Sequence, residues 1–141
     1  MYLWENLLFM KKLYPILLVT FFSLVTHAQT VDIPDLEFKN KLLTYSPTID
    51  LDEDGEIQVS EAAQVTFLNF SFCNFNNMTG IQAFANLEML SLGSYVTIAM
   101  PIDLTGMNSL KSLHLTKCST PSINFEGLTS LESLSIGYGS Q

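Results

Sequence analysis

Six carboxylates lie within twelve residues, from Asp50 to Glu61, in the segment IDLDEDGEIQVSEA (residues 49–62). Their mutual repulsion calls for a compensating charge, and a hard cation is the first to consider, because calcium binds carboxylate and carbonyl oxygens. The segment matches every specified position of the calcium-loop pattern D-x-[DN]-x-[DN]-G-x5-E. The predicted metal ligands are Asp50, Asp52, Asp54, Glu56 through its backbone carbonyl, Gln58 through a water molecule, and Glu61.

The spacing of these residues fits the geometry of a cation site. Side chains at alternate positions can converge on one point, Gly55 permits the sharp turn, and Glu61 can return to bind with both oxygens. A solvated acidic turn is the alternative interpretation, but it does not explain why Gly55 and Glu61 fall where the metal geometry needs them. We therefore expect a structural calcium site with the weak affinity of extracellular calcium modules.

The residues around the loop predict a small N-terminal cap over residues 29–63. The segment IPDLEFKNKLL (residues 33–43) has proline and acidic residues near its start and apolar Phe38 and Leu42 on one face, which predicts a short helix. Pro47 interrupts the approach to the loop, and barely one helical turn can follow it. A calcium sensor with two long helices that open a groove is therefore not expected.

An apolar pattern recurs four times in residues 64–141. The period of 21 to 23 residues and the form L-x-x-L-x-L are typical of leucine-rich repeats. One such unit cannot enclose its own core, so neighbouring units stack and their strands run parallel. The sequence predicts an α/β solenoid of about four parallel strands. The four blocks are Val65-x-x-Leu68-x-Phe70, Leu87-x-x-Leu90-x-Leu92, Leu110-x-x-Leu113-x-Leu115 and Leu131-x-x-Leu134-x-Ile136.

Strand residues that alternate with these leucines are expected to face solvent and to form the concave binding face of a solenoid. This face is mostly small and polar, and it could hold a protein, peptide or glycan, or remain an ordinary solvated surface. His114 is the only histidine after residue 28, and no nucleophile and acid can be named beside it, so we do not expect an enzyme. The predicted ligand face is Phe67, Asn69, Ser71, Met89, Ser91, Ser112, His114, Thr116, Ser133, Ser135 and Tyr138.

The two cysteines occupy equivalent positions two repeats apart. In this alignment the position is filled by Cys73, Tyr95, Cys118 and Gly139 in turn. Two strand spacings separate Cys73 from Cys118 by roughly 10 Å, whereas a disulfide needs Cα atoms within about 7 Å. We expect two buried, reduced and unreactive cysteines, with a disulfide as the alternative that would also refute the repeat alignment.

The first 28 residues have the layout of a secretory signal peptide. Lys11 and Lys12 precede an apolar run that is short for a membrane span, and cleavage is expected after Ala28. Met10 is a possible true start, and an uncleaved N-terminal anchor is the alternative. The expected mature chain has no membrane span, four lysines, no arginine and thirteen acidic residues, which argues against a nucleic-acid partner.

The signal peptide, IPDLEFKNKLL, DLDEDGEIQVSEA and TGIQAFANLEMLSL together resemble the secreted leucine-rich-repeat proteins of Bacteroidetes-type bacteria. The resemblance implies an extracellular or surface binding module without catalysis, with calcium rigidifying the cap. The alternative is a purely structural N-terminal part of a longer surface protein. The chain stops at Gln141, directly after the fourth block, so truncation, a genuine small protein and self-association through the uncapped last repeat all remain open.

Overall fold

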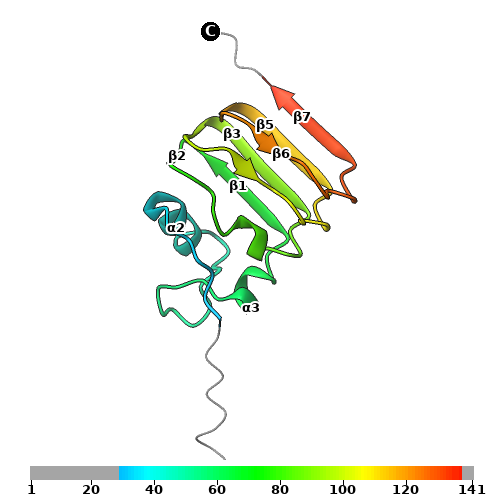
Figure 1. Ribbon diagram of the computed structural model, residues 1–141. Coiled ribbons are helices and arrows are strands. Elements are labelled where there is room, and N and C mark those ends of the chain that lie inside the picture. Colours follow the sequence, from blue (N-terminus) through cyan, green and yellow to red (C-terminus); the bar gives the residue numbers. More distant parts are fainter. Residues whose placement is uncertain (1–28, 138–141) are drawn as a thin grey trace, which may run out of the picture.

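The computed structural model describes residues 29–137, which form a stack of parallel strands with a small helical cap at one end (Figure 1). The proposed signal peptide and Tyr138 of the proposed ligand face lie outside the described residues. Strands and helices follow the chain in the order α2, α3, β1, β2, η1, β3, β4, β5, β6 and β7.

Four parallel strands cross the main sheet in the order β1-β3-β5-β7, and a fifth, two-residue strand, β2 (Asn74–Phe75), pairs with β3. Each strand follows the apolar residue that opens a repeat block, and the chain returns to the same end of the sheet before the next strand begins. The result is a β-solenoid of about three turns. The strands are β1 (Phe67–Ser71), β3 (Met89–Ile98), β5 (Ser112–Ser119) and β7 (Ser133–Gly137).

Two rows of aligned apolar residues confirm the repeat alignment. Each predicted inward position pairs with its counterpart in the next strand, so side chains of similar shape stack along the core. Alternate residues along a strand point to opposite faces, so the intervening positions face solvent as predicted. The rows are Leu68, Leu90, Leu113 and Leu134, and Phe70, Leu92, Leu115 and Ile136.

The return segments of the solenoid contain short strands in place of helices. Within the described part of the repeats, residues 64–137, the only helical element is the 3-10 turn η1 (Ile81–Ala83). The parallel stack is therefore confirmed, whereas the α-helices of the predicted α/β class are found only in the cap. The short strands are β2 (Asn74–Phe75), which pairs with β3, and β4 (Ile102–Asp103), which pairs with β6 (Ile123–Asn124).

A bulge in β3 overturns one predicted ladder position. The register between β3 and β5 shifts between Gly93 and Val96, so that Val96, and not Tyr95, pairs with Cys118. Val96 is fully buried, whereas Tyr95 is 63% exposed. The prediction for Tyr95 was wrong because a bulge inserts a residue that leaves the ladder, which a fixed sequence spacing cannot show.

Exposed side chains stack beside this bulge. Phe72, Tyr95 and Lys117 each have a positive φ, of 55°, 67° and 57°, a conformation that costs a non-glycine residue about 1 kcal/mol or more. The rings of Phe72 and Tyr95 stack with centroids 6.0 Å apart, and the Lys117 Nζ lies 5.0 Å from the Tyr95 centroid. Stacking and cation–π contacts of this kind offset part of that backbone cost.

Both cysteines are free thiols, as the repeat alignment predicts. Asn74 pairs with Thr97, and Thr97 pairs with Ser119, so Cys73 and Cys118, each one residue earlier, lie two strands apart. Cys73 is buried, but Cys118 is only half-buried, which corrects the prediction that both are fully enclosed. Burial still raises the pKa of the Cys118 thiol, so its thiolate is scarce at neutral pH.

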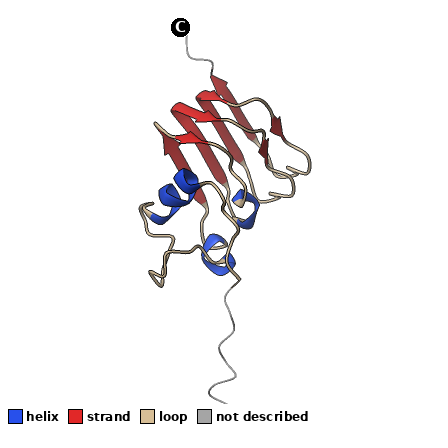
Figure 2. Cartoon of the chain, turned by 60° about the vertical axis from the view of Figure 1, so that its left-hand side comes forward, coloured by secondary structure: helices blue, strands red, loops and turns tan. Residues whose placement is uncertain are grey.

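The cap contains two helices, α2 (Leu36–Leu43) and α3 (Val59–Ala62), which gather at the β1 end of the sheet (Figure 2). Helix α2 confirms the helix predicted in residues 33–43 and buries Phe38 and Leu42 completely. The Phe38 ring makes edge contacts with Phe70 and Phe75, at centroid distances of 5.8 and 5.3 Å. The cap and the first repeat therefore share one hydrophobic core.

A candidate cation site in the acidic loop

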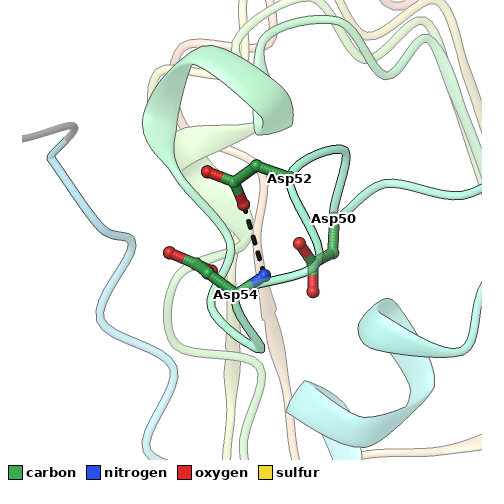
Figure 3. Close-up of side chains that lie close together, drawn as sticks. All are labelled: Asp50, Asp52 and Asp54. Carbon is green, nitrogen blue, oxygen red and sulfur yellow. Dashed lines mark hydrogen bonds between the residues drawn. The ribbon is translucent and has the colours of Figure 1, made fainter.

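The acidic loop lies between α2 and α3, and three of its carboxylates converge. One oxygen each from Asp50, Asp52 and Asp54 lies within 4.8 Å of the others (Figure 3). Asp52 and Asp54 are exposed, whereas Asp50 is only 8% exposed and forms the floor of the cluster. The structure thus brings together the first three of the six predicted metal ligands.

Asp50 has one satisfied and one unsatisfied carboxylate oxygen. Its Oδ2 accepts a hydrogen bond from the Gly55 backbone N–H at 3.0 Å. Its Oδ1 is buried and has no hydrogen-bond partner. An ionised oxygen left buried and unpaired costs several kcal/mol, about 1–3 even for a neutral group. A cation in the cluster would supply the missing partner.

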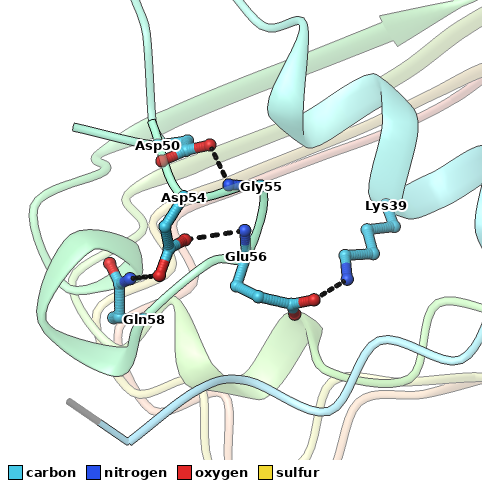
Figure 4. Close-up of polar contacts among 6 residues, drawn as sticks. All are labelled: Lys39, Asp50, Asp54, Gly55, Glu56 and Gln58. Atoms are coloured by element: carbon cyan, nitrogen blue, oxygen red, sulfur yellow. Dashed lines mark hydrogen bonds and ion pairs between the residues drawn. The ribbon is translucent and has the colours of Figure 1, made fainter. Parts of the chain in front are cut away.

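Backbone amides fold the loop around this cluster. Asp54 N–H donates to Asp52 Oδ1 at 3.4 Å, and Glu56 N–H donates to Asp54 Oδ1 at 2.8 Å (Figures 3 and 4). Gly55 has a φ of +81°, which supplies the sharp turn that the sequence predicted at this position. These bonds hold the three carboxylates close together, with oxygens within 4.8 Å of one another.

Gln58 places an amide donor between two of the carboxylates. Its Nε2 lies 2.9 Å from Asp54 Oδ2 and 3.2 Å from Asp52 Oδ2. Figure 4 shows the bond from Gln58 to Asp54 within the loop. Gln58 is 4% exposed, so a buried donor bonds to carboxylates that are themselves exposed. The predicted role of Gln58 was to act through a water molecule, whereas the structure shows direct contact with two predicted ligands.

Both carboxylate oxygens of Glu61 accept hydrogen bonds from backbone amides. Its Oε1 accepts from Leu51 N–H at 2.6 Å, and its Oε2 accepts from Gln58 N–H at 2.9 Å. The second bond is part of a capping box at the start of α3. The predicted bidentate role of Glu61 toward a cation stays a prediction, because both of its oxygens already have partners and it lies outside the three-carboxylate cluster.

The side chain of Glu56 points away from the cluster and toward helix α2. Its Oε1 lies 2.6 Å from Lys39 Nζ of helix α2, and both groups are partly exposed (Figure 4). The predicted ligand at this position is the backbone carbonyl, so the ion pair leaves that role free. It also ties the loop to α2, a contact that sequence spacing did not predict.

A buried aspartate outside the loop connects the cap to the first repeat. Asp35 Oδ1 accepts from Phe38 N–H at 2.7 Å and caps α2, while Oδ2 accepts from Asn76 N–H at 2.6 Å and Asn77 N–H at 3.2 Å. Its place before a helical segment indicated the capping role in part. Nothing in the sequence indicated the bonds to residues 41 and 42 positions further along the chain.

The described residues of the predicted ligand face lie together on one face of the main sheet. Its described members align across the strands, and in β1, β3 and β5 they alternate with buried residues. The central row carries hydrogen-bonding side chains on all four strands, and the row beside it begins with the aromatic ring of Phe67. The rows are Asn69, Ser91, His114 and Ser135; Phe67, Met89, Ser112 and Ser133; and Ser71, Gly93, Thr116 and Gly137.

A surface hollow that the sequence did not indicate lies between the loop and the first strand. Its volume is about 300 Å³, and Tyr45, Leu51, Glu61 and Phe67 line part of it. Leu51 and Phe67 are 57% and 45% exposed, so the hollow has an apolar rim. The acidic loop and the predicted ligand face therefore meet at this point of the surface.

No family model, curated protein or solved structure matches the chain. Among residues 29–137, no helix is long and apolar enough to cross a membrane. A function therefore has to be inferred from the structure itself. Its two candidate features are an oxygen-rich cluster suited to a hard cation at one end and an aligned polar face along the sheet.

Proposed function

We propose that this protein is a non-catalytic interaction module in which a calcium ion stabilises the cap of a parallel repeat stack. The observation that carries the proposal is the buried Asp50 Oδ1, which has no hydrogen-bond partner and belongs to a cluster of three carboxylates. A protein seldom leaves such an oxygen unpaired, because desolvating an ionised carboxylate is costly. A cation bound by the cluster would remove that cost.

Calcium is the cation that this set of groups suits best. All the available atoms are oxygens, which favour hard cations over zinc or copper. Calcium also accepts six to eight ligands in flexible arrangements, which suits a loop that combines carboxylates, the Glu56 carbonyl and water. Gln58 and Glu61 would join the ligands only after giving up their present hydrogen bonds.

Thermal unfolding of the purified protein, with calcium and with chelator, tests the proposal. At a calcium concentration about 100 times Kd, binding adds about 2.7 kcal/mol to the free energy of unfolding, which raises the midpoint by roughly 10 °C for a domain of this size. Asp50→Asn should lose this rise. In chelator the variant should be about as stable as the wild type, because it removes the buried charge but leaves its amide N–H groups without a partner.

Asp103→Asn is the matched control for this experiment. Asp103 is an exposed aspartate of β4 that also accepts hydrogen bonds in a local turn, but it lies outside the acidic loop. The control should keep the full calcium response. An unchanged wild-type midpoint at millimolar calcium would refute the cation site and leave the solvated acidic turn as the interpretation.

The aligned polar face supports a second function, the binding of a peptide, protein or glycan. The row of Asn69, Ser91, His114 and Ser135 presents hydrogen-bonding groups at the regular spacing of neighbouring strands, about 4.8 Å. Extended chains with repeated polar groups could bind along such a row. His114→Ala and Met89→Ala should abolish capture of a ligand from peptide and glycan arrays without changing the unfolding midpoint.

The resemblance to secreted leucine-rich-repeat proteins supports an extracellular or surface location. Residues 1–28 would direct secretion, and the calcium concentration outside a cell would keep a weak site occupied. N-terminal sequencing of the exported protein should begin at Gln29. If the protein serves only as the N-terminal cap of a longer repeat protein, calcium will stabilise it and the arrays will capture nothing.

A further inference from the structure

We infer that the segment Gln29–Ile33 couples the acidic loop to the repeat stack, so that a cation in the loop also stabilises the strands of the first repeats. The inference rests on the proposed cation site and adds a route by which that site acts. The route has three contacts: Gln58 with the carboxylates, the loop with residues 29–31, and residues 31–33 with the first repeat.

The first contact is the buried amide of Gln58. Its Nε2 donates to Asp52 and Asp54, which are both predicted cation ligands. A cation that binds these carboxylates changes the electrostatic surroundings of this donor, because the positive ion and the amide N–H groups interact with oxygens of the same two carboxylates. Cation binding therefore acts directly on residue 58.

The second contact is a short antiparallel pairing between the loop and residues 29–31. Thr30 forms a bridge with Gln58. Val31 N–H donates to Ile57 O at 2.8 Å, and Val59 N–H donates to Gln29 O at 2.8 Å. The residue whose side chain lies among the carboxylates is thus the residue whose backbone faces Thr30. Ordering this part of the loop also orders its partner segment.

The third contact is the close packing of residues 31–33 against the first repeat. Gly80 opens the 3-10 turn η1, and a Cβ placed on it would lie 2.7 Å from Asp32 O and 2.9 Å from Ile33 Cγ1. Val31 and Ile33 are each 8% exposed and belong to the shared core. Only glycine allows the segment to approach this turn so closely.

Gly80→Ala is the variant that breaks the third contact. Gly80 has a φ of +98°, so alanine adds both a backbone cost and a clash with the segment. Gly106→Ala is the matched control, because Gly106 has a φ of +79° but a Cβ there would meet nothing within 4 Å. Val31→Ala is a milder second variant, which loosens the same contact if Gly80→Ala does not fold.

Hydrogen exchange followed by mass spectrometry, with calcium and with chelator, measures the coupling separately in each region. In the wild type, calcium at ten times Kd should slow exchange about tenfold both in the loop, residues 50–62, and in the β1–β3 strands. In Gly80→Ala, or in Val31→Ala, the loop should still respond, and the strands should respond less than twofold. Gly106→Ala should behave as the wild type does.

The outcomes separate this inference from the proposed function. If calcium slows exchange in the wild-type loop but not in its strands, the cation site stands and the coupling is refuted. The coupling is also refuted if Gly80→Ala and Val31→Ala keep the strand response, or if Gly106→Ala loses it. If calcium changes exchange nowhere in the wild type, both the cation site and the coupling fail.

Discussion

The two ends of the main sheet carry equivalent residues in very different surroundings. Leu68 in β1 and Leu134 in β7 occupy the same row, yet Leu68 is 0% exposed and Leu134 is 48% exposed. In the next row, Phe70 is 2% exposed and Ile136 is 51% exposed. Strand type, register and residue class are nearly the same at both ends, so only the neighbouring elements explain the difference.

The cap supplies those neighbours at the β1 end. Phe38 and Leu42 of α2 cover the core, and the Tyr45 hydroxyl accepts from the Asn69 N–H at 2.9 Å, which satisfies a backbone donor on the edge strand. Among the described residues, no element covers β7 in this way. In a repeat stack, a strand residue is therefore only as buried as the elements on both sides make it.

Leucine truncation at the middle and at the open end should show the largest contrast. Leu90→Ala, in the fully buried middle of the row, should lower the free energy of unfolding by about 3 kcal/mol or more. Leu134→Ala should lower it by less than about 1 kcal/mol, because half of the side chain already contacts solvent. Urea unfolding measures both, and equal losses would contradict the comparison.

Asp35 provides the next largest test, because it bonds the cap to the first repeat. Asp35→Ala removes a helix cap and leaves the Asn76 and Asn77 amides without their acceptor, so a loss of about 2–3 kcal/mol is expected. Asp103→Ala removes a similar set of local bonds at an exposed site and should cost less than about 1 kcal/mol. Chemical denaturation compares the two variants.

Tyr45→Phe tests the cover over the β1 edge with a single atom. The change removes the acceptor for the Asn69 N–H and keeps the ring that packs against Phe70 at a centroid distance of 6.0 Å. The expected loss is about 1 kcal/mol, together with faster exchange of the Asn69 amide proton. An unchanged exchange rate would mean that water satisfies this edge equally well.

Asp103, on the exposed surface of the repeats, should contribute only slightly to the pH dependence of stability. Hydrogen bonds, chiefly from Thr105, hold the pKa of Asp103 below its ordinary value of 3.8. The pKa of Asp103 is lower in the folded state than in the unfolded state. The ionised carboxylate therefore contributes its full stabilisation above the unfolded-state pKa, and this stabilisation is lost as pH falls through the folded-state pKa. Asp103→Asn should therefore make the unfolding midpoint slightly less sensitive to pH below about 4.

The smallest effect on stability is expected at Ile136 of β7. Ile136→Lys should leave the unfolding midpoint nearly unchanged, because the side chain is already 51% exposed. It should reduce concentration-dependent association, since charged residues on a sheet edge disfavour pairing with another chain. Sedimentation velocity over a range of concentrations measures this, and equal association of variant and wild type would exclude β7 as the contact.

The sequence by itself determined the features that repeat or that span few residues. The apolar spacing predicted which residues face the core in all four main strands, because side chains alternate along a strand and each unit has to stack on the next. The spacing of the acidic residues predicted that Asp50, Asp52 and Asp54 converge, because a tight turn brings alternate side chains to one side. Both are local rules.

Only the tertiary structure decided which distant segments contact one another and which residue leaves the strand ladder. The bulge that expels Tyr95, the reach of Asp35 to Asn76, and the packing of residues 31–33 on Gly80 depend on contacts between segments far apart in the chain. The same is true of Glu61, whose oxygens bind backbone amides. The sequence pattern indicates which face a residue occupies and which bonds its side chain can form. Its actual partners depend on how the cap and the repeats pack together.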